Sequence, residues 1–216
     1  MTNTHAWSRV RGLEPVSLCD WPGNVVCVLF LGGCNCKCPH CHNADLAWRP
    51  STLPITPRET VEHYIRARGA WLDGLVVTGG EPVMDSSIVD FIDDIGGLGL
   101  PIKLDSNGMH PEILETILSL GCVKKVSVDI KGPFEKYEEL TGGSFGEEAA
   151  REHFAALFEM ARRRPEAFHF RTTLVPELTD DDIRTVRTLL PSGCVLTTQQ
   201  YIEPKGKETT ACQSSS

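Results

Sequence analysis

The sequence predicts an α/β fold built on a parallel sheet, because strand-like and helix-like segments alternate along most of the 216 residues. Short apolar segments rich in β-branched residues precede segments with apolar residues at helical spacing, and this β-α order is read six times. Such repetition gives a parallel sheet with right-handed crossovers. Six units are too few for a closed eight-stranded barrel, so we expect a partial, open (βα)6 barrel forming a single domain over residues 1–216.

The first strand is expected at residues 25–31, which are nearly all apolar, as in a strand buried on both faces. Residues 1–24 are expected to form an irregular N-terminal segment, because Pro15 and the run Asp20-Trp21-Pro22-Gly23 indicate turns. The remaining strands are expected at residues 74–78, 102–105, 123–130, 168–175 and 195–201.

Helices are expected where apolar residues recur every three or four positions between these strands. Thr56-x-x-Glu59 fits a capping box with Pro57 at the first helical position, and Thr179 is expected to cap the last helix. The polar residues 203–216 are expected to form a loose tail. The expected core faces are Val61, Tyr64, Ile65 and Arg68; Ile88, Phe91, Ile92 and Ile95; Ile113, Leu114, Ile117 and Leu120; Phe154, Leu157, Phe158 and Ala161; and Ile183, Val186 and Leu190.

The composition excludes some classes of partner. A net charge of −8 argues against a nucleic acid or an acidic membrane surface, which a basic face would bind. No apolar run reaches the length of a membrane span, and residues 1–10 lack the apolar region of a secretion signal. Nine cysteines in such a chain favour a reducing cytoplasm with metal or redox chemistry over a disulfide framework.

The most informative stretch follows the first expected strand and holds Cys34, Cys38 and Cys41 in the spacing C-x3-C-x2-C, with Cys36 between the first two. Thiolates this close in sequence can converge on a soft metal centre, and a [4Fe–4S] cluster held by three of them leaves one iron open. The alternatives are unligated thiols, a redox or disulfide site, and structural zinc with Cys36 or His42 as fourth ligand. We prefer the cluster.

Polar and glycine-rich residues follow the other expected strands, where sites form in parallel α/β folds. Taken singly, Gly79-Gly80 could be a simple turn, and Asp129 and Lys131 could be a structural ion pair. Several strand ends that agree with the cysteine loop instead predict one functional face. Its further candidates are Glu81-Pro82, Asp105-Ser106-Asn107-Gly108, Arg171-Thr172-Thr173 and Gln199-Gln200.

Taken together, these motifs resemble the radical S-adenosylmethionine (SAM) superfamily, and over about residues 12–202 the chain is similar to glycyl-radical-enzyme activating proteins. The resemblance is greatest to the activating proteins of anaerobic ribonucleoside-triphosphate reductases. It is carried by Ser17-Leu18-x-Asp20-x-Pro22-Gly23, Gly33-Cys34-Asn35, Cys38-Pro39-x-Cys41-His42-Asn43, Gly79-Gly80-Glu81-Pro82, Asp105-x-Asn107-Gly108 and Asp129-Ile130-Lys131.

The resemblance implies that Cys34, Cys38 and Cys41 hold a [4Fe–4S] cluster whose fourth iron is chelated by the methionine end of SAM. Reductive cleavage of SAM would then give methionine and a 5′-deoxyadenosyl radical that abstracts hydrogen from the substrate. Gly79 and Gly80 would let backbone carbonyl groups approach the methionine ammonium.

Further roles are implied by the same resemblance. Lys131 would pair with the methionine carboxylate, and His40 would lie near adenine. Asp105 and Asp129 are candidates for a monovalent cation site. The other expected SAM-binding residues are Glu81, Ser106, Asn107, Asp129 and Gln199, with Val175 and Gln200 near adenine and ribose.

The chain also departs from the family pattern. His40 stands where an aromatic residue is common, and Ser106 where threonine is commoner. Cys36 is unusual inside the motif and could be a solvent-side thiol or a mis-assigned ligand. Residues 50–74 hold no cysteine-rich insert, so we expect no additional clusters.

The sequence therefore predicts an enzyme that generates a glycyl radical on a partner protein, most plausibly an anaerobic ribonucleotide reductase, with flavodoxin or ferredoxin as electron donor. Two alternatives stay open. One is a radical SAM enzyme acting on a small molecule or peptide, as in a 7-carboxy-7-deazaguanine synthase-like reaction. The other is a non-catalytic metal-binding module.

Overall fold

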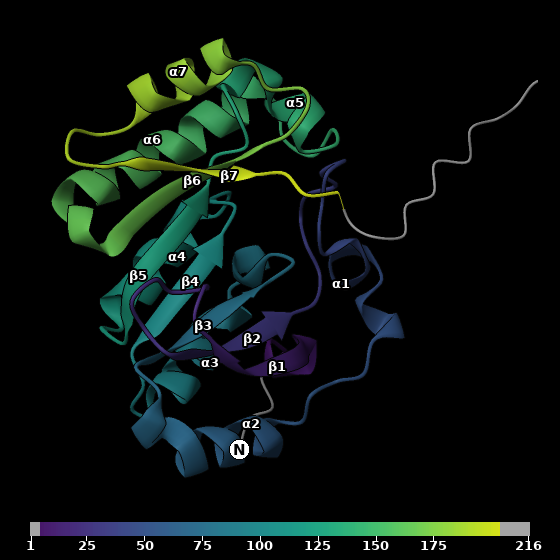
Figure 1. Ribbon diagram of the computed structural model, residues 1–216, viewed down its shortest axis with the longest axis vertical. Helices are drawn as coiled ribbons and strands as arrows, with labels where there is room; N and C mark the ends of the chain where they lie inside the picture. The colour runs from purple at the N-terminus through teal and green to yellow at the C-terminus, as the bar shows by residue number, and fades with distance from the viewer. Residues whose placement is uncertain (1–4, 204–216) are drawn as a thin grey trace, which may run out of the picture.

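The computed structural model describes residues 5–203, and seven strands in this part of the chain form one sheet in the order β1 to β7 (Figure 1). β1 is antiparallel to β2, whereas every later neighbour pair is parallel. β1 and β7 are the two edges, so the sheet is an open barrel, as expected. The strands are β1 (Val10–Ser17), β2 (Val26–Leu31), β3 (Gly74–Gly79), β4 (Ile102–Ser106), β5 (Val123–Asp129), β6 (Phe168–Leu174) and β7 (Leu196–Gln200).

Helices connect the parallel strands at the expected places, and in the described residues β7 is followed by no helix. The tail expected over residues 203–216 lies outside the described residues except for Glu203. The capping prediction at Thr179 is confirmed, because its side chain and that of Asp182 form a reciprocal capping box. The helices are α1 (Ala44–Trp48), α2 (Arg58–Arg68), α3 (Ser87–Gly96), α4 (Pro111–Ser119), α5 (Tyr137–Leu140), α6 (Glu147–Arg163) and α7 (Asp180–Leu189).

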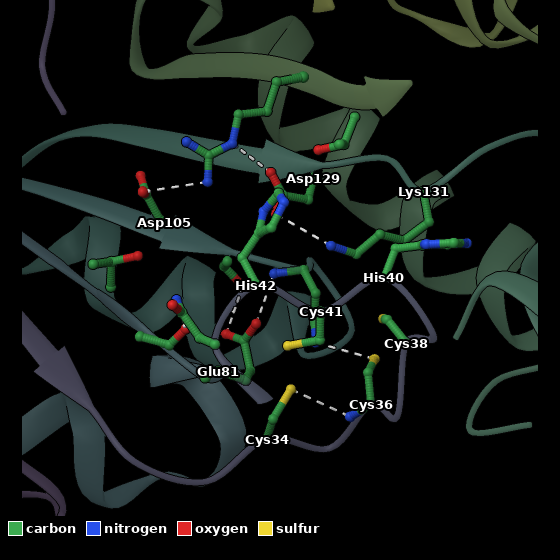
Figure 2. A pocket seen from close by; sticks show the side chains of 18 of the residues that line it. Cys34, Cys36, Cys38, His40, Cys41, His42, Glu81, Asp105, Asp129 and Lys131 are labelled. Atoms are coloured by element: carbon green, nitrogen blue, oxygen red, sulfur yellow. Dashed lines mark hydrogen bonds and ion pairs between the residues drawn. The ribbon is translucent and has the colours of Figure 1, made fainter. Parts of the chain in front are cut away.

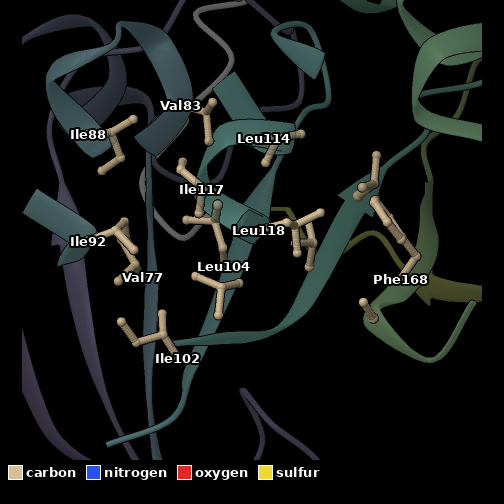
Figure 3. Close-up of a cluster of buried hydrophobic side chains, with 14 of the residues drawn as sticks. Val77, Val83, Ile88, Ile92, Ile102, Leu104, Leu114, Ile117, Leu118 and Phe168 are labelled. Carbon is tan, nitrogen blue, oxygen red and sulfur yellow. The ribbon is translucent and has the colours of Figure 1, made fainter. Parts of the chain in front are cut away.

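The main core lies between one face of the sheet and the helices. Figure 3 shows Val77 and Leu104 from the sheet beside Ile92 and Ile117, which come from α3 and α4. All four side chains are fully buried. Because side chains on a strand alternate between faces, the residues between these core positions must point to the other side of the sheet.

The inner face of the open barrel changes character across the sheet. On β2 and β3 it is apolar, with Val26, Val28 and Val76 in a second buried cluster. On β4, β5 and β6 the corresponding positions are polar or charged. They are Lys103, Asp105, Lys125, Ser127, Asp129, His169, Arg171 and Thr173.

The prediction of an irregular N-terminal segment over residues 1–24 is wrong for residues 10–17, which form the edge strand β1 on β2. Pro15 is tolerated there because an edge strand has a free side, and the pairing register shifts twice along the strand. Of the two turns predicted in this segment, only the one at Asp20 to Gly23 is confirmed.

The capping box expected at Thr56 and Glu59 is also wrong. The helix α2 begins at Arg58, and Pro57 precedes it in an extended conformation without a side-chain cap. The backbone N–H of Thr56 donates instead to the carbonyl oxygen of Val10 at 2.9 Å. The contact with β1 therefore holds Thr56 in place.

A glycine after α5 packs against the cysteine loop. Lys37 N donates to Thr141 O at 2.9 Å, and the next residue, Gly142, has φ +64°. A Cβ on Gly142 would stand 2.1 Å from the carbonyl oxygen of Lys37. Gly143 also has a positive φ, +76°, but a Cβ there would meet nothing within 4 Å.

We predict that Gly142→Ala destabilises the protein by about 2 kcal/mol and lowers the Tm by about 4–8 °C, because it adds a backbone clash to left-handed strain. Gly143→Ala carries only the strain, at about 1 kcal/mol. Thermal unfolding followed by circular dichroism compares the two variants. Equal Tm values would contradict the proposed packing of Gly142 on the cysteine loop.

Candidate functional site

A cavity of about 330 Å³ opens at the carboxyl ends of the parallel strands (Figure 2). Most residues singled out from the sequence line it, whereas Pro82, Gly108, Thr172 and Gln200 do not. The lining includes Cys34, Cys38, His40, Cys41, Gly79, Gly80, Glu81, Asp105, Ser106, Asn107, Asp129, Lys131, Val175 and Gln199.

The cysteine loop lies between β2 and α1 and brings three thiols to this cavity. Gly33 N donates to Leu46 O at 2.9 Å, and Cys41 N donates to Cys38 O at 3.1 Å, so both halves of the loop are turned back on themselves. Between residues 5 and 203, no three Cys, His, Asp or Glu side chains stand close enough to share a single metal ion. A cluster needs no such convergence, since each iron takes its own thiolate.

Cys36 is not the solvent-side thiol that its position suggested, because only 3% of it is exposed. Trp48 Nε1 donates to its carbonyl oxygen at 3.0 Å, and Asn107 Nδ2 lies 3.4 Å from its sulfur. Hydrogen bonds between Cys36 and the flanking thiols raise the pKa of Cys36 and lower those of Cys34 and Cys38. Cys36 therefore remains a buried thiol behind the other three.

For Cys38, the hydrogen bond from Cys36 and the charge of Lys131 together outweigh burial and bring its pKa to about 6. Because a thiolate and not a thiol binds iron, this environment favours metal binding at neutral pH. The donor set of the loop thus fits an iron–sulfur cluster.

Gly79 and Gly80 allow the end of β3 to touch the cysteine loop. Gly80 N donates to Leu31 O at 2.9 Å, and Glu81 N donates to Gly33 O at 2.8 Å. A Cβ on Gly80 would stand 2.1 Å from Gly33 O, and one on Gly79 would stand 2.3 Å from Leu31 O. Glycine is thus required at both positions because a side chain would collide with the backbone of the cysteine loop and β2, whether or not a ligand is bound.

The carboxylate of Glu81 joins the ends of β3 and β4. It is 1% exposed and accepts hydrogen bonds from Ser106 Oγ at 2.9 Å and from the backbone N–H of Asn107 at 2.6 Å. The N–H of Val83 is a third donor, at 2.9 Å. Burial raises the pKa of Glu81, although these hydrogen bonds oppose the shift. The Glu81 side chain therefore holds the ends of β3 and β4 together, and almost none of it is exposed to a ligand.

Arg9 is a buried residue of the site that the sequence did not indicate. Its guanidinium donates to the carbonyl oxygens of Gly32, at 2.9 Å, and Pro82, at 3.2 Å, and also to that of Glu81. Burial lowers the pKa of Arg9, while the charge of Asp85 opposes this. Arg9 thereby ties the cysteine loop to the Gly-Gly-Glu-Pro turn from behind.

Five charged side chains form a chain of alternating sign along the inner face of the barrel. Lys103 pairs with Asp105, and Arg171 Nη2 lies 3.3 Å from the other oxygen of Asp105. The Nε of Arg171 donates to Asp129 Oδ1, and Lys131 Nζ donates to Asp129 Oδ2 at 3.2 Å. The two carboxylates that were expected to bind a monovalent cation are therefore engaged by protein cations.

These pairs fix the charge states. Burial raises the pKa of Asp129, but Arg171 and Lys131 outweigh it and hold the pKa well below its usual value. Burial lowers the pKa of Lys131, but the negative charges of Asp129 and Cys38 outweigh it and raise the pKa. Within the described part of the chain the Lys131 ammonium donates to Asp129, and an ammonium can donate three hydrogen bonds. Lys131 thus presents a fixed positive charge to the cavity.

Glu177 and Tyr201 contact two histidines that line the cavity, His40 and His42. His40 Nε2 lies 2.8 Å from Glu177 Oε1, and the His40 ring packs edge-on against Tyr201. His42 stacks on the same Tyr201 ring, with centroids 5.3 Å apart. Glu177 and Tyr201 were not recognised from the sequence, because no local pattern links them to the cysteine loop.

Most of the chain is similar to known proteins. Residues 28–190 match the family model described as the radical SAM superfamily. The chain is 30% identical to a protein of Methanocaldococcus jannaschii, provisionally described as a glycyl-radical enzyme activating enzyme, over 91% of this chain and 80% of that protein. It is 28% identical to the pyruvate formate-lyase-activating enzyme of Clostridium pasteurianum, over 56% of this chain and 54% of that one.

The fold is also found among solved structures. The crystal structure of Streptococcus suis SuiB bound to precursor peptide SuiA superposes with a TM-score of 0.62 at 14% identity, covering 82% of this chain and 39% of SuiB. Among residues 5–203, no helix is both long and apolar enough to cross a membrane. The match of residues 28–190 to the family model shows that this protein belongs to the radical SAM superfamily.

Proposed function

We propose that this radical SAM enzyme generates a glycyl radical on a partner protein, and that the partner is an anaerobic ribonucleotide reductase. The observation that carries the proposal is one cavity that gathers three loop thiols, a Gly-Gly turn and the charged Lys131 at the open end of the sheet. The similarity over 91% of the chain to a protein provisionally described as an activating enzyme supports the choice of a protein substrate.

Cys34, Cys38 and Cys41 would hold a [4Fe–4S] cluster at the mouth of the barrel. When bound, the cluster and SAM supply an electron and a sulfonium that give methionine and a 5′-deoxyadenosyl radical able to abstract hydrogen. Cys36 would not be a ligand of the cluster, since its sulfur is buried and faces Asn107 and the flanking thiols.

The other lining residues would bind and orient SAM. The Lys131 ammonium would pair with the methionine carboxylate, with Asp129 holding it in place. Backbone carbonyl groups at Gly79 and Gly80 would approach the methionine ammonium. His40, Val175 and Gln199 would border adenine and ribose. Ser106 and Asn107 are fixed by Glu81 and would approach the sugar and carboxylate.

A macromolecular substrate is compatible with the edges of the sheet. β1 and β7 do not pair with each other, so the described sheet is open between these two edge strands. A glycine-bearing loop of a partner could enter on this side. We place the reaction in the reducing cytoplasm, because nine cysteines in this sequence favour metal or redox chemistry over a disulfide framework. The electron donor in this proposal is flavodoxin or ferredoxin.

The test is to mix the reduced, cluster-loaded enzyme with SAM and an anaerobic ribonucleotide reductase without oxygen and to record an EPR spectrum. We expect a glycine-centred doublet that is lost when the radical-site glycine of the partner is replaced by alanine. Deoxyadenosine release without a doublet on any glycyl-radical partner would reject the proposal and favour a small-molecule or peptide substrate. Cluster absorbance without deoxyadenosine release would favour a binding module.

We predict that Cys38→Ala loses the cluster while Cys36→Ala keeps it, because only Cys38 belongs to the proposed three-thiol set. The measurements are iron per chain and deoxyadenosine yield after anaerobic reconstitution. The two variants are matched, since each removes one loop thiol that faces the same group of sulfurs. Loss of iron from Cys36→Ala equal to that from Cys38→Ala would refute the assignment of ligands.

We predict that Lys131→Met weakens SAM binding by about 10- to 100-fold, the loss expected for one hydrogen bond to a charged group. Lys124→Met is the control, because Lys124 lies exposed at the other end of β5 and donates to Gly121 O. Equilibrium dialysis of SAM against the oxidised, cluster-loaded protein gives both dissociation constants. Equal values for the two variants would remove Lys131 from the SAM site.

A further inference from the structure

We propose that Arg171 is a built-in replacement for a monovalent cation in this enzyme, and that it positions Lys131 for SAM through Asp129. The inference builds on the proposed SAM site, because Lys131 is assigned there to the methionine carboxylate. Arg171 itself is a positioning residue, since it acts through Asp129.

The position of Arg171 follows from strand register. Arg171 on β6 is the direct ladder neighbour of Asp129 on β5, so both side chains stand on the inner face of the barrel. The guanidinium reaches past Asp129 to Asp105 on β4, with Nη2 3.3 Å from Asp105 Oδ2. A single side chain therefore bridges the carboxylates of Asp105 and Asp129, which come from two strands and are labelled in Figure 2.

Each of the four carboxylate oxygens already has a cationic partner. Arg171 takes one oxygen of each carboxylate. Lys103 pairs with the second oxygen of Asp105, and Lys131 with the second oxygen of Asp129. An alkali-metal ion would have to displace one of these groups to gain the carboxylate oxygens as ligands.

Charge counting leads to the same conclusion. Three cationic side chains, Lys103, Arg171 and Lys131, face two carboxylates, so the group already carries a net charge of +1. A further cation between the carboxylates would meet like charges within a few ångströms, which is unfavourable in a partly buried site. The side chains of Lys103 and Asp105 are 4% and 9% exposed, so water screens this pair little. The residues therefore do not fit a monovalent cation.

The bridge also places Asp129 where it can hold Lys131. Arg171 anchors Asp129 through one carboxylate oxygen, and the second oxygen accepts a hydrogen bond from Lys131 Nζ. Burial lowers the pKa of Arg171, but Asp129 and Asp105 outweigh it and raise the pKa, so the guanidinium stays charged. The guanidinium of Arg171, which is covalently part of the chain, thus holds the Asp129–Lys131 pair in position.

The first test compares SAM binding by the oxidised, cluster-loaded wild-type protein in potassium chloride, sodium chloride and choline chloride at equal ionic strength. We expect the SAM dissociation constant from equilibrium dialysis to change by less than about twofold, because the required charge is covalently part of the chain. A loss of about tenfold or more in choline, reversed by potassium, would overturn the proposal.

The second test removes the guanidinium. Arg171→Ala leaves Asp105 and Asp129 with vacant oxygens, so we expect SAM binding weakened by about tenfold or more in choline chloride and restored in part by potassium or guanidinium ions. Arg187→Ala, at an exposed position on α7, is the control and should bind SAM as the wild type does in every salt. Binding by Arg171→Ala that equals the wild type, or a loss that no small cation reverses, would refute the role.

A second variant keeps the test decisive if Arg171→Ala does not fold. Arg171→Lys retains the charge but lacks the two-sided reach of guanidinium, so we expect an intermediate SAM affinity that potassium improves. Unfolding midpoints measured in the same salts separate a loss of structure from a loss of SAM binding. Failure of the wild type to bind SAM in any salt would count against the proposed function, whereas salt-independent binding without a glycyl radical would leave the role of Arg171 intact.

Discussion

The site depends on a close backbone contact between the cysteine loop and the end of β3. Gly80 N bonds to Leu31 O and Glu81 N bonds to Gly33 O, and neither bond could form if Gly79 or Gly80 carried a side chain. These bonds set the height of the three thiols above the carboxyl ends of the sheet. Arg9 reinforces the contact by donating to backbone carbonyl groups on both sides of it. The loop that holds the chemistry is thus an extension of the barrel wall.

The second organising feature is the division of the inner barrel face into an apolar and a charged half. Valines on β2 and β3 fill one half, and paired charges on β4, β5 and β6 fill the other. Buried ion pairs of this kind cost desolvation energy and contribute little to net stability. Their value here is positional, because each carboxylate is held by two cations and leaves Lys131 directed into the cavity. A ligand with a carboxylate would meet a charge already fixed in space.

The sequence was sufficient for the parallel strands and for most of the cavity lining, because apolar β-branched segments and the polar residues after them are local signals. It was not sufficient for β1. Pro15 obscures this strand, and its pairing partners lie far away in the sequence, as Leu31 does for Val10. Arg9 was missed because its partners are backbone carbonyls at residues 32, 81 and 82, which no side-chain pattern encodes. The bridge made by Arg171 depends on strand register, which the sequence alone leaves open.

The central claim is that three thiols hold a cluster whose remaining iron binds the methionine end of SAM. Mössbauer spectroscopy of the protein reconstituted with ⁵⁷Fe, recorded with and without SAM, tests it most directly. The account predicts the signal of a four-iron cluster in which one iron alone changes its isomer shift and quadrupole splitting when SAM is added. A four-iron signal that SAM leaves unchanged, or iron bound singly in a tetrahedral sulfur site, would contradict it.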